Sequence, residues 1–435
     1  MASPVSLDTI IALCKRRGFV YQSAEIYGGL NGVYDFGPLG TLMNQNLRTV
    51  WRASLENKKG DIVDLEGSLL GPRSVWEASG HIENFHDPMV DCLECKHRYR
   101  ADELNLEKAC PNCGKANWSE VRQFNMMFKT NLGALAEQAS EAYLRPETAQ
   151  AIFVNFKNVI STTRVKLPFG IAQIGKAFRN EITPKQFLFR VREFEQMELE
   201  WFCKADQADE AFTFWRDKRM AFYETLGLKK DNVRFHEHEK GELAHYSVCC
   251  TDVEYQFPFG WKELEGIAHR GTFDLSQHSK HSGKDLAVYD EATKTSEIPT
   301  VIECSVGVGR LFLALLCDAY VEDEVGGESR VVLKLHPRIA PMKAAILPLS
   351  KKLSEPAKKL FDTIKKETGY QLQFDETGSI GKRYRRQDEI GTPLCVTYDF
   401  DSEDDQCVTV RHRDSTKQER IAIADVVSYL KKVIG

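Results

Sequence analysis

Residues 171–202 carry charged side chains at the spacing expected of two paired β-strands. Residues two apart along a strand share one face of a sheet, so Arg179 and Glu181 are expected on one face of the first strand. Alternate residues of the second strand share a face in the same way: Arg190, Arg192, Phe194, Gln196, Glu198 and Glu200. A charged face backed by an apolar one suits the floor of a binding site. The alternative interpretation is a solvent-exposed sheet with cross-strand ion pairs.

A second candidate element is a strand followed by a glycine-rich turn. The alternation over 300–305 predicts a strand with Glu303 and Ser305 on one face and Cys304 directed to the core. The sequence 307–310 has two glycines, ends in an arginine and leads into a strongly apolar helix. Its alternative interpretation is a buried helix preceded by capping glycines.

Four of the twelve cysteines form two CxxC pairs, separated by fourteen residues: Cys92 with Cys95, and Cys110 with Cys113. This spacing suits tetrahedral coordination of zinc by thiolates, with no open position, so we expect a structural metal. Reduced core cysteines are the alternative, but the segment 88–122 is polar and cannot easily bury them. A zinc ribbon alone would also fit a nucleic-acid-binding protein and does not decide the function.

The two charged elements occur in the order of known sequence motifs. Residues 178–181 followed by 192–194 look like motif 2 of the class II aminoacyl-tRNA synthetases, and the turn at 307–310 resembles motif 3. The helix after residues 37–38, with the strand that ends at 68–73, is the counterpart of motif 1. In that family motif 1 forms the dimer interface. The resemblance therefore implies a homodimer.

The resemblance is finer than the class. Further segments look like those of glycyl-tRNA synthetases: FNMMFKT (124–130), YLRPETAQ (143–150), VREFEQMELEWF (191–202) and WKELEGIAHRGTFDLSQH (261–278). The match runs from about residue 8 to the C-terminus, and the tail resembles the anticodon-binding domain shared by the glycyl, histidyl, prolyl and threonyl enzymes. The implied activity is ATP-dependent activation of glycine with release of pyrophosphate, then transfer to the terminal adenosine of tRNA(Gly).

The resemblance also implies residues for ATP. Both reactants of the activation step are anions, so the protein must supply positive charge and in-line alignment. Arg179 would grip the α-phosphate and the carboxylate, Phe194 and Arg310 would enclose the adenine, and Glu181 would accept from its amino group. The catalytic residues are Arg179 and Arg310, and the ATP-binding residues are Arg179, Asn180, Glu181, Arg190, Phe194, Glu263, Leu264, Gly307 and Arg310. Mg²⁺ is expected because it neutralises the phosphates.

Glycine has no side chain, so selection must rest on its ammonium group and on excluding larger substrates. The family uses three glutamates for this purpose, and their matches are Glu147, Glu198 and Glu303, with Ser305 closing the pocket. Clustered carboxylates favour a cation strongly. Two further arginines match the substrate side of the family's site, Arg100 and Arg270, and each alone is typical of a surface ion pair.

These elements predict an α+β fold. We expect a class II catalytic domain over 1–330, built on a large antiparallel sheet flanked by helices, with a zinc-ribbon-like insertion at 88–122. A C-terminal α/β anticodon-binding domain is expected over 335–435, because strand and helix patterns alternate there, and the linker is expected near 322–336.

Cap residues place several helices. A helix near the N-terminus should be capped by Ser6 or Asp8 and end at Gly18. Further helices are expected over 39–56, over 354–369 with Ser354 at the cap, and over 418–434. Strands are expected at 344–349 and within three later segments, YQLQFDE, LCVTYDF and QCVTVRHR.

Composition limits the partners. The formal net charge is −5, so a nucleic-acid partner must be held by local basic patches. The clusters 382–386 and 411–413 are candidates for tRNA phosphate contact, or simply a solvated face. No apolar run approaches the roughly 20 residues that span a bilayer, and the N-terminus lacks the order of a signal peptide. We expect a cytoplasmic enzyme with no membrane partner.

Two other functions stay open at this point. A catalytically inactive relative of the synthetases would keep the fold and lose the motif arginines, which are present here. A class II enzyme for serine, threonine or proline is disfavoured by the three glutamates. The residues do not indicate the source organism, the anticodon-reading residues, an organellar pool or a diadenosine tetraphosphate side activity.

Overall fold

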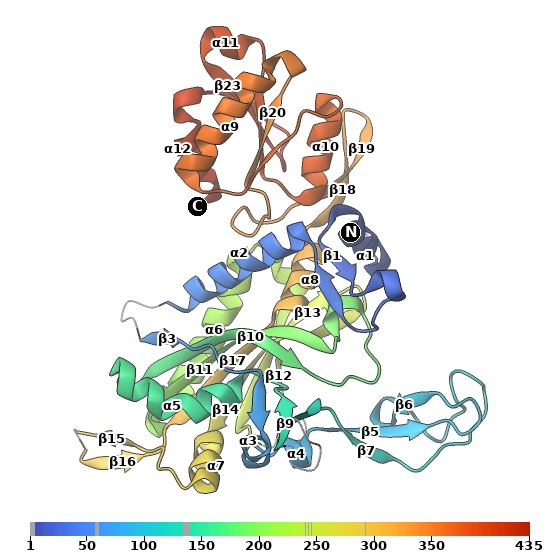
Figure 1. Ribbon diagram of the computed structural model, residues 1–435, viewed down its shortest axis with the longest axis vertical. Coiled ribbons are helices and arrows are strands. Elements are labelled where there is room, and N and C mark those ends of the chain that lie inside the picture. The colour runs from blue at the N-terminus through green and yellow to red at the C-terminus, as the bar shows by residue number, and fades with distance from the viewer. Residues whose placement is uncertain are drawn as a thin grey trace.

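The computed structural model describes residues 5–56, 61–133, 140–239, 241, 243–244, 246–291 and 293–435. Its centre is a seven-stranded sheet in the order β12-β13-β14-β17-β11-β10-β3 (Figure 1). Neighbouring strands are antiparallel, except that β3 pairs parallel to β10. The predicted large antiparallel sheet is thus confirmed with one parallel edge strand. The strands are β3 Ile62–Asp64, β10 Phe169–Phe178, β11 Glu193–Cys203, β12 Val233–Glu237, β13 Cys249–Phe257, β14 Gly260–Gly271 and β17 Thr300–Gly307.

The two faces of this sheet are covered differently. The largest core lies on one face, where Leu199, Cys304 and Val306 pack with the buried sides of α1, α2, α6 and α8. Cys304 is fully buried there, as predicted. On the other face α5 and α7 pack over the end marked by Phe169 and Phe202. The rest of that face carries the charged residues. The helices are α1 Leu7–Arg17, α2 Pro38–Leu55, α5 Ala149–Thr163, α6 Ala208–Thr225, α7 Phe273–Ser282 and α8 Val308–Ala319.

Helix ends follow the predicted caps near the N-terminus. The Ser6 hydroxyl oxygen accepts a hydrogen bond from the Thr9 amide, and Gly18 ends α1 in the left-handed conformation with φ 74°. Helix α2 begins at Pro38, one residue before the expected start, because proline suits the first turn of a helix.

The first strand of the charged pair is shorter than predicted. It ends at Phe178, so Arg179 and Glu181 lie in the loop that follows rather than on a strand face. The Asn180 amide donates to the Met126 carbonyl, and the Glu181 amide donates to the Arg179 carbonyl. Similarly, β11 begins at Glu193, so Arg190 and Arg192 precede it. Tight turns replace the ladder that alternation predicted.

The cysteine-rich segment forms a sheet of its own in the order β6-β5-β7, which projects from the catalytic part (Figure 1). A second small sheet, β4-β9-β8, lies at its base. The elements of this part are β4 Leu70–Pro72, α3 Arg73–Ala78, α4 His81–Asn84, β5 His86–Asp91, β6 Arg98–Arg100, β7 Arg122–Asn125, β8 Lys129–Leu132 and β9 Ser140–Leu144. Two further strand pairs are β1 Val20–Gln22 with β2 Tyr34–Phe36, and β15 Val288–Asp290 with β16 Thr295–Glu297.

The expected linker is a β-hairpin. Strands β18 (Tyr320–Val325) and β19 (Glu328–Leu333) pair antiparallel across the segment predicted to link the two domains. Arg330 holds this hairpin in place, because its guanidinium is buried and pairs with Asp323 within the hairpin and with Asp388 of the C-terminal part. The segment expected as a linker near 322–336 thus contains a hairpin that is joined to the C-terminal part through Arg330.

The C-terminal part has a five-stranded sheet in the order β21-β20-β22-β23-β24. Strand β20 is parallel to both neighbours, and the β23 pairs are antiparallel. The elements are β20 Ala344–Pro348, α9 Ser354–Thr368, β21 Leu372–Phe374, α10 Ile380–Ile390, β22 Leu394–Tyr398, α11 Asp401–Asp405, β23 Cys407–His412, β24 Gln418–Ala422 and α12 Val426–Ile434. This is the α/β architecture that the alternating pattern predicted.

Two local predictions in this part were wrong. The expected helix over 418–434 is a strand in its first third, because residues 418–422 add an edge strand to β23, and the helix begins only at Val426. Ser354 does not cap α9, since its hydroxyl donates to Glu376 while Leu353 occupies the cap position. Within the described residues, none of the helices has the length and apolarity that crossing a membrane requires.

Candidate active site

Two adjoining pockets open on the charged face of the large sheet. The first, here called the aromatic pocket, includes Phe189 and Phe194 in its wall. The second, here called the carboxylate pocket, includes Glu147, Glu198 and Glu303. The pockets share four lining residues, Arg179, Gln196, Glu263 and Ser305. A ligand in one pocket would therefore lie directly beside a ligand in the other.

Arg179 stands at the junction of the pockets and is held rigidly. Its guanidinium carbon lies 5.3 Å from the ring centroid of Phe85 and 5.2 Å from that of Phe194. Its Nε donates to the Pro146 carbonyl at 3.1 Å. Cation–π contacts with two rings and one backbone bond restrain the guanidinium group. The remaining N–H groups are then available to an anion that enters the junction.

Arg310 enters the aromatic pocket from the first turn of α8. Its guanidinium carbon lies 4.5 Å from the Phe189 ring centroid, and its Nη1 lies 2.8 Å from a carboxylate oxygen of Glu263. The positive charge of Arg310 lowers the pKa of the Glu263 carboxyl. Gly307 is the last residue of β17 and directly precedes α8, so the strand end fixes the position of Arg310.

Most residues predicted for ATP line the aromatic pocket: Arg179, Glu181, Arg190, Phe194, Glu263, Gly307 and Arg310. Burial raises the pKa of Glu181, and Arg190 and Arg179 partly offset this rise. Two predicted residues do not line either pocket. Asn180 bonds through its backbone to Met126, and the Leu264 side chain is buried in the core on the other face.

Glu198 is the most extensively bonded carboxylate of its pocket. It accepts hydrogen bonds from the hydroxyls of Thr148 and Ser305, the latter at 2.7 Å, and from the Gln196 amide at 2.8 Å. Glu198 and Ser305 are direct neighbours in the β11–β17 register. The three donors fix the carboxylate in place before any ligand is bound.

Glu147 and Glu303 complete the carboxylate pocket. Glu147 accepts from Gln150 at 3.0 Å and lies 3.2 Å from His81 Nε2. Glu303 forms an ion pair with Arg270. The three carboxylates come from three separate elements: the loop before α5, strand β11 and strand β17. Their convergence agrees with the sequence-based prediction.

Burial and mutual repulsion set the charge of this pocket. Burial raises the pKa of Glu303 to about 7, and burial together with the charge of Glu147 raises the pKa of Glu198. The pKa of Glu147 is lowered, because His81 and Arg270 outweigh its burial. A cation placed among the three carboxylates would relieve the repulsion and favour their charged forms.

The two predicted substrate-side arginines are placed differently. Arg270 is buried beneath the carboxylate pocket, where it forms two bonds of 2.8 Å to Asp274 and lies 3.8 Å from the Tyr246 ring centroid. Arg100 lies on β6 of the projecting sheet and pairs with Asp87 at 2.9 Å. Neither arginine lines the two pockets.

Several supporting residues were not predicted: Phe85, Thr148, Gln150, Tyr246 and Asp274. They act through contacts between segments far apart in sequence. Gln150, for example, donates to both Glu147 and Asp274, at 3.0 and 2.9 Å. The position of Thr148 beside Glu147 is the only local signal that could have pointed to one of them.

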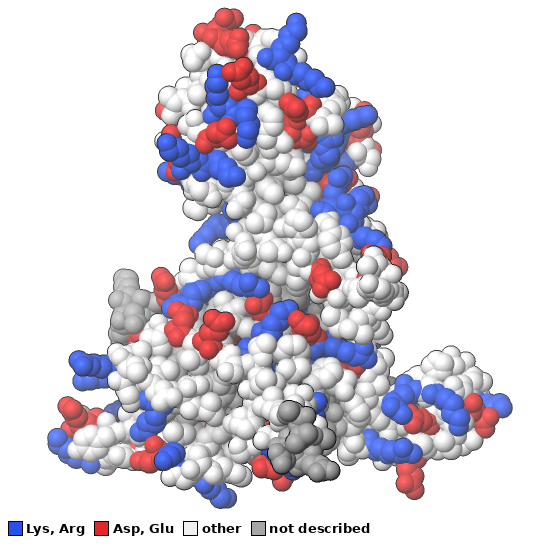
Figure 2. All heavy atoms as spheres, viewed as in Figure 1, with Lys and Arg blue, Asp and Glu red and all other residues white. Residues whose placement is uncertain are grey.

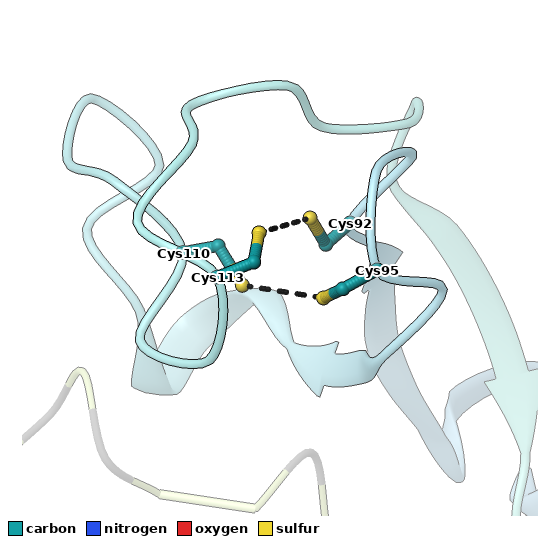
Figure 3. Close-up of side chains that lie close together, drawn as sticks. All are labelled: Cys92, Cys95, Cys110 and Cys113. Carbon is teal, nitrogen blue, oxygen red and sulfur yellow. Dashed lines mark hydrogen bonds between the residues drawn. The ribbon is translucent and has the colours of Figure 1, made fainter.

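The four CxxC cysteines form a compact cluster at the far end of the projecting sheet (Figure 3). The Sγ atoms of Cys92 and Cys113 are 3.6 Å apart, those of Cys95 and Cys110 are 3.7 Å apart, and all four lie within 4.8 Å of one another. A tetrahedral zinc with Zn–S bonds of about 2.3 Å places its sulfur atoms about 3.8 Å apart. The cluster fits such an ion.

Comparison with known proteins places the chain in a family. The tRNA synthetase class II core domain (G, H, P, S and T) matches residues 128–332, and the anticodon binding domain matches residues 343–433. A glycine–tRNA ligase from Caldanaerobacter subterraneus subsp. tengcongensis is 52% identical over 459 aligned residues, covering 99% of both chains. The chain belongs to the glycine–tRNA ligase family. The ligase from Borrelia hermsii is 50% identical, covering 99% of this chain and 98% of the relative.

A solved structure agrees at the level of fold. The prolyl-tRNA synthetase of Cryptosporidium parvum, in complex with L-proline and AMP, superposes with a TM-score of 0.67. The match covers 99% of this chain and 75% of that one at 16% identity. The class II architecture is therefore shared well beyond the ligases for glycine.

The arginine clusters of the C-terminal part are less available to RNA than the sequence suggested. Arg383 is buried and donates to the carbonyl oxygens of Pro348 and Asp375. Arg411 is buried against Asp388, and Arg413 is buried as well. Lys382 is exposed, however, and basic side chains occupy several parts of the surface of this domain (Figure 2). Three residues of the two predicted clusters, Arg383, Arg411 and Arg413, therefore serve the interior of the domain.

Proposed function

We propose that this protein is a glycine–tRNA ligase that works in two steps: transfer of the adenylyl group of ATP to glycine, then transfer of the glycyl group to tRNA(Gly). The observation that carries the proposal is the convergence of Glu147, Glu198 and Glu303 in a pocket that shares Arg179 with the aromatic pocket. Three carboxylates select an ammonium group. A neighbouring arginine suits the two anions that must react, a carboxylate and a phosphate.

ATP binds in the aromatic pocket in this proposal. The adenine lies between Phe194 and Arg310, its amino group donates to Glu181, and the α-phosphate lies against Arg179 at the junction. Arg190 and Gly307 border the nucleotide. Asn180 and Leu264 act indirectly, by holding their pocket-lining neighbours Arg179, Glu181 and Glu263 in place. Mg²⁺ enters with ATP and neutralises its phosphates. The Glu263 carboxylate lines the pocket wall on the side where ATP and Mg²⁺ would lie.

Glycine binds in the carboxylate pocket with its ammonium group among the three glutamates. Ser305 borders the pocket and fixes Glu198. Rejection of alanine in this proposal is steric, because its methyl group must fit beside an ammonium group that three fixed carboxylates hold. Arg270 acts beneath the pocket by holding Glu303, and Arg100 borders the entrance from the projecting sheet.

Activation follows from this arrangement. A glycine carboxylate oxygen attacks the α-phosphorus, the bond to the bridging oxygen breaks, and pyrophosphate leaves with its electron pair. Arg179 stabilises the negative charge that develops on the α-phosphate oxygens, and Arg310 holds the nucleotide in line. The terminal hydroxyl of tRNA(Gly) then attacks the carbonyl carbon of the adenylate, loses its proton and displaces AMP.

The remaining assignments follow the same family resemblance. Residues 1–330 are assigned to the catalytic domain, 88–122 to a zinc-binding insertion and 335–435 to the anticodon-binding domain. Cys92, Cys95, Cys110 and Cys113 would hold a structural Zn²⁺. The protein would act in the cytoplasm as a homodimer through motif 1, which includes α2.

Aminoacylation tests this function directly. The purified protein should attach radiolabelled glycine to a tRNA(Gly) transcript in the presence of ATP and Mg²⁺, but not to a transcript for proline or threonine. Charging of the proline or threonine tRNA with its own amino acid would indicate another class II specificity. A protein that binds neither ATP nor glycine by calorimetry would be a non-catalytic relative.

A further inference from the structure

Glu200 lies two residues after Glu198 on β11, on the same face of the sheet, and is directly opposite Glu303 on β17. Its side chain is fully buried. Neither of its carboxyl oxygens has a hydrogen-bond partner among the residues that the structure describes. Every other acidic residue around it is bonded. A buried carboxyl without donors is rare and calls for a physical explanation.

The surroundings of Glu200 contain many carboxyl groups and few cations. Glu303, Glu198 and Asp274 act on it electrostatically, and Glu147 lines the same pocket as Glu198 and Glu303. Arg270 is the neighbouring cation, but each of its three guanidinium nitrogens donates to Asp274 or Glu303 rather than to Glu200. Tyr246 covers the guanidinium face. The two nearby histidines, His81 and His278, are bonded to Ser79 and Gln150, respectively.

Carboxylates in so small a volume cannot all be ionised at once. The proton should reside where the charged form is least stabilised. Glu198 receives three hydrogen bonds, Glu147 receives one from Gln150 and faces His81, and Glu303 and Asp274 are paired with Arg270. Glu200 receives none. An unpaired buried charge costs far more than a neutral buried carboxyl.

We propose that Glu200 is a permanently protonated positioning residue of the carboxylate pocket. By remaining neutral beneath Glu303, it leaves Glu147, Glu198 and Glu303 free to ionise around an ammonium group. The inference rests on the proposed function, because the ammonium group is that of glycine. Burial and the charge of Glu303 raise the pKa of Glu200 well above its ordinary value, which agrees with this assignment.

Glu200→Gln tests the charge of the residue, because an amide matches a protonated carboxyl in size and in charge. If Glu200 is neutral, the variant should keep the glycine KM within about 3-fold of the parent. It should also keep the acid limb of the pH profile of kcat/KM for glycine in place. If Glu200 is ionised, its removal should lower the pKa of Glu303 and move that limb to lower pH by about one unit. Because a purely structural role would also leave the limb in place, an infrared measurement of the protonated carboxyl is needed beside the kinetics.

Glu303→Gln is the matched control on the facing strand and should raise the glycine KM at least about tenfold while the ATP KM stays near the parent value. An equal rise of the glycine KM in Glu200→Gln and Glu303→Gln would overturn the inference, as would a shifted acid limb in Glu200→Gln.

The parent protein should also show the infrared band of a protonated carboxyl group at about pH 8.5, where Glu303 is ionised. Absence of that band would overturn the inference even if the variant fails to fold. Absence of any glycine-dependent reaction in the parent would instead refute the proposed function, and the band would still report on Glu200.

Discussion

The Ser305 hydroxyl donates a hydrogen bond of 2.7 Å to Oε1 of Glu198, and the two residues face each other across the β11–β17 pair. The bond joins β11, the strand that follows the motif 2 residues, to β17, the strand that leads into the motif 3 turn. Because β17 continues through Gly307 into α8, the same strand also positions Arg310. Substrate-side and nucleotide-side groups are thus fixed by one stretch of backbone.

Glu198→Gln should weaken glycine binding selectively. The amide keeps the size of the side chain but removes the charge that faces the ammonium group. Loss of one charge-assisted bond costs about 1.5–3 kcal/mol, so the glycine KM should rise about 10- to 100-fold. The ATP KM should change by less than about 3-fold. Steady-state kinetics of pyrophosphate exchange with each substrate varied in turn measures both.

Glu193→Gln is the matched control on the same strand. Glu193 is exposed and pairs with Lys176 at 2.9 Å, so its loss should leave both KM values unchanged. Equal rises of the glycine and ATP KM values in Glu198→Gln would show that Glu198 does not bind the ammonium group.

Activity at low glycine should depend on pH through Glu303. The pKa of this carboxyl is raised to about 7, so it gains a proton and loses its charge as the pH falls through that value. We therefore expect kcat/KM for glycine to fall on the acid side of about pH 7. The kcat at saturating glycine should fall at a lower pH, because the bound ammonium group lowers the carboxyl pKa. Coincident acid limbs for the two parameters would contradict this account.

Arg179→Lys should reduce the rate of adenylate formation by about 10²- to 10³-fold, although the charge is retained. A lysine ammonium group cannot keep the planar contact with both Phe85 and Phe194 or present two N–H groups side by side. Rapid-quench measurement of a single turnover reports the step. Arg164→Lys, at an exposed helix end, should leave the rate unchanged. A near-normal rate in Arg179→Lys would mean that its geometry is unimportant.

The purified protein should contain about one zinc ion per chain, held by the four clustered cysteines. Cys113→Ser should lower the zinc content severalfold, because one of four thiolate ligands is lost. Cys407→Ser lies outside the cluster and should keep the metal. Elemental analysis after gentle purification measures both. Equal zinc content in the two variants would exclude the cluster as the site.

Asp388→Ala should destabilise the C-terminal domain by about 3–5 kcal/mol. The carboxylate is fully buried and pairs with Arg411 and Arg330, so its loss leaves buried charge uncompensated. Denaturant unfolding measures the change. Asp362→Ala removes an exposed pair with Lys358 and should cost less than about 0.5 kcal/mol. Similar decreases in the free energy of unfolding in the two variants would mean that the buried ion pairs contribute no more to stability than the exposed pair.

Local patterns predicted those features that depend on neighbouring residues. Alternation identified the strand 300–305 and the core position of Cys304, and the Ser6 and Gly18 caps marked the ends of α1. CxxC spacing placed four thiols together because each pair already lies in one short turn. The convergence of the glutamates, by contrast, was implied by family resemblance and not by spacing.

Long-range contacts account for the failures. Alternation continues past Phe178, but bonds to Met126 and within the turn end the strand there. The segment around Arg330 looks like a linker because its partner Asp388 is distant in sequence. Arginine clusters suggest an RNA-binding surface by composition, whereas burial of Arg383 and Arg411 depends on the packing of α10.

Pyrophosphate exchange with three small acids tests the central claim most directly. Glycine should support exchange, alanine should fail because of its additional methyl group, and glycolic acid should fail because its hydroxyl carries no charge for the three carboxylates. Exchange with glycine alone is the predicted result. Exchange with glycolic acid at a rate comparable to that with glycine would contradict recognition of the ammonium group by Glu147, Glu198 and Glu303.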